Sequence, residues 1–113
     1  MAESDRVRII NRLDGTGTLS TLADGDGTPI TAMWGLQSWL FKGNRLYYTT
    51  SGGLYCRWKG TSATQPADCN GTLISPPAGL PGFGGGKYGG MTLDENGDIL
   101  LAAHELLLKY HAP

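Results

Sequence analysis

Residues 45–58 read RLYYTTSGGLYCRW, two short runs of aromatic, apolar and β-branched residues on either side of Ser-Gly-Gly. Residues of these types favour strands, and glycine supplies the backbone freedom that a tight reversal needs. The pattern therefore predicts a β-hairpin with strands at residues 45–50 and 54–58. Because successive side chains of a strand point to opposite faces, Tyr47 and Tyr48 are predicted to lie on opposite sides of the sheet.

Similar short runs, each bounded by turn residues, lie on both sides of this hairpin. Asp-Gly sequences follow the runs at residues 7–13 and 18–23, and Asn96-Gly97 precedes the run at 99–103. Both dipeptides are typical of tight turns between strands. Residues 99–111 also contain good helix formers, so a strand pair and a C-terminal helix are both open there. The pattern as a whole favours an all-β fold.

Composition narrows the function classes. The chain has 113 residues, a mass of 12.0 kDa, a formal net charge of -1 and 18 glycines. This length predicts a single β-rich domain spanning residues 1–113. Balanced charge gives no electrostatic attraction for nucleic acid, and no apolar run is long enough to insert into a membrane. The first residues lack the apolar core of a signal peptide, so a soluble protein is expected. The sequence leaves the location open, with an extracellular or virion surface as the working expectation.

The two cysteines, Cys56 and Cys69, lie close together in the sequence. A disulfide that closed so short a loop would stabilise the fold by about 3 kcal/mol. Two unlinked thiols are the alternative, because the sequence does not test the geometry that a bridge requires. Without neighbouring histidines the pair does not form a zinc site, and no metal is predicted.

An internal repeat connects the central hairpin with the C-terminal part of the chain. Residues 34–58 and 88–110 share a glycine-containing entry, a strand, a turn with Asn and Gly, a second strand and a third strand with an aromatic end. Such repeats are typical of β-propeller blades. We therefore expect blade-like antiparallel units at about residues 18–59 and 88–111, joined by a Pro/Gly-rich loop at 60–90. Copies of the chain are expected to cover the free sheet edges by forming a closed homo-oligomer. The alternative fold is a small β-sandwich with a C-terminal helix.

A family resemblance points to the same scaffold. Residues 89–101, GGMTLDENGDILL, resemble the blade motif of six-bladed sugar dehydrogenases and related lactonase-type propellers, and residues 51–55 resemble the outer hairpin of such blades. In the dehydrogenases a histidine before the glycine pair is the catalytic base, and here Tyr88 occupies that place. Two blades also do not form the six-bladed cavity that holds a quinone cofactor. The resemblance thus implies a scaffold without catalytic residues or cofactor, and an enzyme fragment of this type is the weakest alternative.

Aromatic residues are the candidate functional groups. Trp and Tyr combine a flat apolar face with a polar group, which suits both sugar stacking and protein interfaces. The candidate ligand or interface residues are Trp34, Trp39, Tyr48, Tyr55, Trp58 and Tyr88. They predict a non-catalytic, lectin-like module that binds carbohydrate or protein. The alternative is a structural subunit of a phage or virion surface, or of another large assembly.

Overall fold

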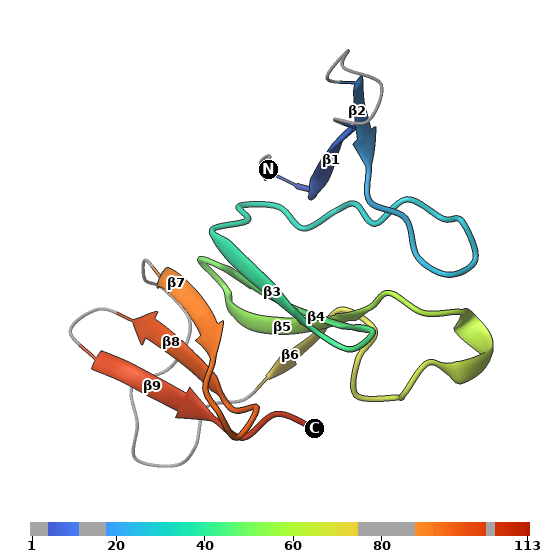
Figure 1. Cartoon of the computed structure of the whole chain (residues 1–113). Coiled ribbons are helices and arrows are strands. Elements are labelled where there is room, and N and C mark those ends of the chain that lie inside the picture. Colours follow the sequence, from blue (N-terminus) through green and yellow to red (C-terminus); the bar gives the residue numbers. More distant parts are fainter. Residues whose placement is uncertain (1–4, 12–17, 75–87, 104–105) are drawn as a thin grey trace.

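The computed structural model describes residues 5–11, 18–74, 88–103 and 106–113, which form three antiparallel sheets (Figure 1). The N-terminal sheet consists of β1 (Arg8–Asn11) and β2 (Thr18–Thr21). The central sheet consists of β3 (Ser38–Lys42), β4 (Arg45–Thr50), β5 (Gly53–Trp58) and β6 (Thr72–Ile74). The C-terminal sheet consists of β7 (Tyr88–Leu93), β8 (Ile99–Ala103) and β9 (Leu106–Tyr110). One short 3-10 helix, η1 (Ser62–Thr64), precedes β6. The all-β prediction is confirmed.

The central sheet is built on the predicted hairpin. Strands β4 and β5 pair antiparallel from Arg45↔Trp58 to Thr50↔Gly53. Tyr47 packs into one hydrophobic cluster and Tyr48 into another, on opposite sides of the sheet. The alternation of strand side chains therefore places two adjacent tyrosines in two different environments.

Both faces of the central sheet are covered, so it is the middle layer of the molecule (Figure 1). On one face, the first cluster joins the sheet to the N-terminal segment through Val7, Leu22, Ile30, Met33, Leu46 and Tyr48. On the other face, the second cluster joins it to the C-terminal sheet and tail through Tyr47, Leu54, Cys56, Cys69, Ile99, Leu101 and Ala112. The Lys42 ammonium adds a polar tie, because it donates to the carbonyls of Gly97 and Ala112, each at 2.8 Å.

Cys56 and Cys69 hold the segment between β5 and β6 against the central sheet. Their Sγ atoms lie 2.03 Å apart, at disulfide distance, and both residues are buried. Next to the bridge, the N–H of Gly71 donates to the Cys56 carbonyl at 2.8 Å. The predicted pairing is confirmed.

Two elements differ from the sequence-based expectations. Strand β6 lies inside the stretch expected to be a loop, and it pairs with β5 through Leu54↔Ile74 and Cys56↔Thr72. Three residues are too few for a recognisable strand pattern, and β6 comes shortly after the disulfide-bonded Cys69. Residues 75–87 of the expected loop lie outside the described residues. The alternative with a C-terminal helix is wrong, because β8 and β9 are strands. The propeller resemblance and the expected ring of copies stay predictions.

Two turns share one pattern of hydrogen bonds. Asp24 Oδ1 accepts from the N–H groups of Asp26 and Thr28, each at 2.9 Å. Asp94 Oδ1 accepts in the same way from residues 96 and 98, again at 2.9 Å. Each of these carboxylates therefore closes a turn, as the Asp-Gly and Asn-Gly sequences predict.

Candidate functional site

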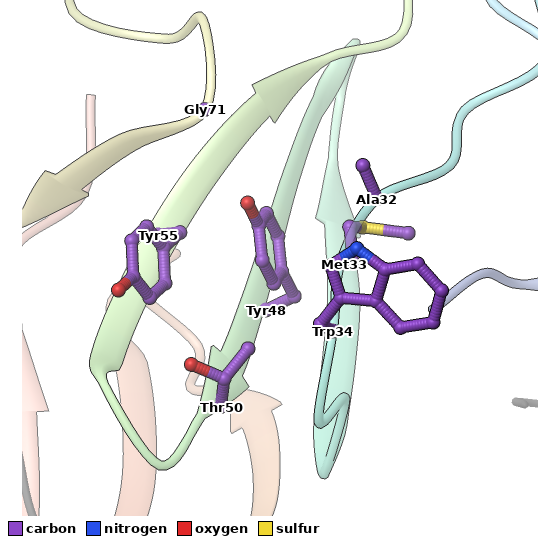
Figure 2. Close-up of a pocket in the computed structure, with 7 residues that line it drawn as sticks. All are labelled: Ala32, Met33, Trp34, Tyr48, Thr50, Tyr55 and Gly71. Atoms are coloured by element: carbon purple, nitrogen blue, oxygen red, sulfur yellow. The ribbon is translucent and has the colours of Figure 1, made fainter. Parts of the chain in front are cut away.

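Three of the predicted aromatic residues, Trp34, Tyr48 and Tyr55, line one hollow of about 260 Å³ (Figure 2). We call it the Trp34 hollow. Its other lining residues are Ala32, Met33, Thr50 and Gly71. Figure 2 shows the two tyrosines side by side on adjacent strands, with Trp34 beside Met33 on a segment that runs next to them.

The two tyrosines form a stacked pair within the hollow. They stand opposite each other in the register of β4 and β5, with ring centroids 5.3 Å apart and planes inclined by 14°. Tyr48 is buried, whereas Tyr55 is half-buried. Glycine at position 52 leaves room for the Tyr55 side chain, because a Cβ there would lie 2.5 Å from the Tyr55 hydroxyl oxygen. Any larger residue at position 52 would therefore displace Tyr55.

Trp34 is held out at the edge of the hollow by its backbone. Its side chain is 70% exposed, whereas that of the preceding Met33 is 1% exposed. Ala32 and Gly35, on either side of this pair, have φ angles of 64° and 76°. Left-handed backbone costs a residue such as alanine about 1–2 kcal/mol, so tertiary contacts must hold Ala32 there. One such contact is the 2.9 Å hydrogen bond from the Met33 N–H to the Asp5 carbonyl.

The polar groups of the hollow are uncharged. None of the seven lining side chains carries a charge at neutral pH. Burial raises the pKa of the Tyr48 phenol, and the nearby Arg57 guanidinium opposes part of that rise, so this hydroxyl stays protonated. Arg57 also donates to the Thr31 carbonyl at 2.8 Å, which ties the segment that carries Trp34 to β5. The Thr50 hydroxyl accepts from the Gly52 N–H at 3.0 Å and keeps its own proton for another acceptor.

The other three predicted aromatics lie elsewhere. Trp39 is opposite Tyr48 in β3, but it packs edge-on against Phe41, with ring centroids 5.5 Å apart. Trp58 packs partly on the second cluster, and its indole N–H donates to the Thr61 carbonyl at 2.9 Å. Tyr88 begins β7, and its side chain lies outside the described part of the structure.

Ala32, Met33, Thr50 and Gly71 line the hollow but were missed by the sequence analysis. Residue types such as Ala, Met, Thr and Gly carry no recognisable binding signal on their own. They come together only when the segment before β3 packs across the central sheet.

The described residues also bear on metal binding, histidine chemistry and membrane insertion. No group of three or more His, Cys, Asp and Glu side chains there lies close enough to hold a metal ion. His111 Nδ1 lies 2.5 Å from Asp98 Oδ1, and the imidazole side chain is 89% exposed. His104 lies outside these residues. Among the helices in the described ranges, none is long and apolar enough to cross a membrane.

No family model matches the chain, and no curated protein or solved structure matches it. The geometry of its own residues therefore has to carry any assignment of function.

Proposed function

We propose that this chain is a non-catalytic binding module that holds one sugar ring of a glycan in the Trp34 hollow. The observation that carries the proposal is an indole that is 70% exposed at the edge of a hollow lined by a stacked tyrosine pair. An exposed indole gains free energy when a ligand covers its apolar face. The neighbouring hydroxyls of Thr50 and Tyr55 provide hydrogen bonds for the polar edge of a ring.

Size and charge favour a sugar ring over larger or charged ligands. The hollow has a volume of about 260 Å³, below the range of about 300–1,000 Å³ that is typical of sites for cofactors and drug-sized ligands. Its uncharged lining offers no attraction to phosphate groups or nucleic acid. A hexose has about twelve non-hydrogen atoms, and at about 0.3 kcal/mol per atom the binding energy is about 4 kcal/mol. This corresponds to a Kd of about 1 mM for a single ring.

Titration with the methyl glycosides of glucose, galactose, mannose and N-acetylglucosamine, followed by protein NMR, tests the proposal. We expect at least one of them to shift the Trp34 indole N–H and the Thr50 amide. Trp34→Ala should weaken binding at least tenfold. Leu93→Ala is the control, because Leu93 is also an exposed apolar residue but lies on β7, away from the hollow. If no glycoside shifts the Trp34 signal, the proposal is wrong.

A second candidate function, a subunit of a larger assembly, is favoured by the outer face of the C-terminal sheet. Leu107 is 70% exposed and stands opposite Ala102, and the side chains that alternate with them, such as Leu101 and Leu108, pack into the second cluster. The central sheet, by contrast, is covered on both faces. A second copy of the chain could cover this apolar face and give the expected homo-oligomer.

Light scattering after size exclusion tests the assembly. A mass that is a small multiple of 12.0 kDa, reduced to that of one chain by Leu107→Glu, would support it. A wild-type chain that stays monomeric at high concentration would refute it.

The disulfide is compatible with an oxidising compartment, so we also propose an extracellular or virion-surface location.

A further inference from the structure

A second hollow, of about 180 Å³, lies on the opposite face of the central sheet, where β4, β5 and β6 approach β9. We call it the Tyr47 hollow. Its polar lining residues are Arg45, Tyr47, Asp68, Thr72 and Tyr110. It shares no lining residue with the Trp34 hollow.

The Tyr47 hydroxyl is the unusual group in this hollow. Tyr47 is 1% exposed, and its hydroxyl makes no hydrogen bond to any residue in the described ranges. Burial of a hydroxyl without a partner is unfavourable, because its hydrogen bonds to water are lost and not replaced. Such groups are rare in folded proteins, and they call for an explanation by a bound water or a ligand. A buried hydroxyl of this kind beside a cavity therefore points to a water or a ligand as its partner.

The groups around this hydroxyl offer donors and acceptors together. Arg45 Nη1 lies 3.2 Å from Asp68 Oδ1, so the two side chains neutralise each other. The Arg45 side chain is 17% exposed and that of Asp68 61% exposed, which places the carboxylate at the solvent side. The ring of Tyr110 meets that of Tyr47 edge-on, with centroids 6.2 Å apart.

Both phenols of the Tyr47 hollow remain protonated. Burial raises the pKa of Tyr47 and of Tyr110, and the Arg45 guanidinium opposes part of the rise in each case. Arg45 is thus near the Tyr47 hydroxyl, although the pair does not meet hydrogen-bond geometry. Each phenol can therefore donate one hydrogen bond and accept another.

We infer that the Tyr47 hollow is a second binding site, for adjacent hydroxyl groups of a neutral polyol such as a sugar. One ligand hydroxyl would donate to the Asp68 oxygen that Arg45 does not hold and accept from the Arg45 guanidinium. A neighbouring hydroxyl would supply the missing partner of Tyr47. An anion would meet the Asp68 carboxylate, so a neutral ligand fits the charge balance better.

This inference extends the proposed function but does not depend on it, because the two hollows use different residues. If both sites bind, one chain has a sugar site on each face of its central sheet. A branched glycan could then be bridged between chains, with a gain in avidity.

NMR of the full, oxidised chain with ¹³C-labelled tyrosine rings tests the second site, with the same methyl glycosides as probes. We expect the ring signals of Tyr47 and Tyr110 to shift in wild-type protein and in Trp34→Ala. Tyr47→Phe keeps the ring and removes the hydroxyl, and we expect it to weaken binding about fivefold, as the loss of one hydrogen bond predicts. Asp68→Asn should weaken it as well, whereas Glu95→Gln, which removes an exposed charge on the β7–β8 turn, should not.

Three results would overturn the inference. The first is that inorganic phosphate shifts the Tyr47 and Tyr110 signals and that Asp68→Asn makes this binding tighter. The hollow would then be an anion site. Another is a Tyr47 hydroxyl that contacts only a long-lived water and does not respond to any glycoside. The third is binding unchanged in Tyr47→Phe. If glycosides shift the tyrosine signals but not the Trp34 signals, the first site is refuted and the second site stands.

Discussion

Replacement of Tyr47 by phenylalanine removes the hydroxyl and leaves the rest of the packing in place. The ring keeps its edge-on contact with Tyr110 and its place in the second cluster. An unpaired buried hydroxyl costs about 1–3 kcal/mol. The Arg45 charge nearby offsets part of this cost, so we take the lower limit. The ligand-free Tyr47→Phe protein is therefore expected to be more stable than wild type by about 1 kcal/mol.

The change is large enough to measure. At about 2.1 cal/mol/K per residue, a chain of this length gains about 240 cal/mol/K of entropy on unfolding, so about 1 kcal/mol raises Tm by about 4 °C. Urea unfolding followed by circular dichroism should show a higher midpoint with an unchanged slope. Tyr55→Phe is the matched control, and it should stay within about 0.5 kcal/mol of wild type, because Tyr55 is half-buried at the other hollow.

A loss of stability in Tyr47→Phe, instead of a gain, would refute the reasoning. If Tyr47→Phe is less stable than wild type in the absence of ligand, the hydroxyl already has a partner and the hollow needs no occupant. A glycoside that binds there should stabilise the wild type more than Tyr47→Phe, because at a given concentration a tighter ligand stabilises the folded state more. The difference between the two proteins should then shrink as the glycoside concentration rises.

Three further predictions concern the fold. Replacement of Cys56 and Cys69 by serine should lower the free energy of unfolding by about 3 kcal/mol, measured by urea unfolding; an unchanged midpoint would show that the bridge does not constrain the unfolded chain. Ala32→Gly relieves a left-handed alanine, so it should raise Tm, with a net gain of about 0.5–1 kcal/mol after the entropy cost of glycine; a lower Tm would contradict the backbone assignment. Hydrogen bonds from the backbone N–H groups of residues 98 and 96, with Lys109 adding to them, hold the pKa of Asp94 below its ordinary value of 3.8. At pH values above 3.8 the ionised Asp94 therefore stabilises the fold, and this stabilisation is lost as the pH falls from 3.8 through the lowered pKa of the folded protein. Over that pH range the wild type should lose stability more steeply than Asp94→Asn. Parallel pH profiles of the two proteins would disprove the contribution.

Local chemistry was sufficient to predict the central hairpin and the tight turns. The hairpin of β4 and β5 follows from its aromatic and β-branched runs around a glycine pair, and the Asp and Asn-Gly turns follow from side chains that hydrogen-bond to their own backbone. Alternation along β4 was likewise enough to separate Tyr47 from Tyr48. These features are readable because each depends on residues only a few positions apart.

Tertiary contacts decided the rest. Residues 99–110 have propensity for both helix and strand, and the strands form because Ile99 and Leu101 alternate into the cluster below Tyr47. The Trp34 hollow requires the segment before β3 to cross the sheet, and the Tyr47 hollow requires Arg45 to meet Asp68 and Tyr110, far away in the sequence. Such contacts leave no local sequence pattern. The packing energy that offsets the entropy cost of bringing distant segments together exists only once the layers are in contact.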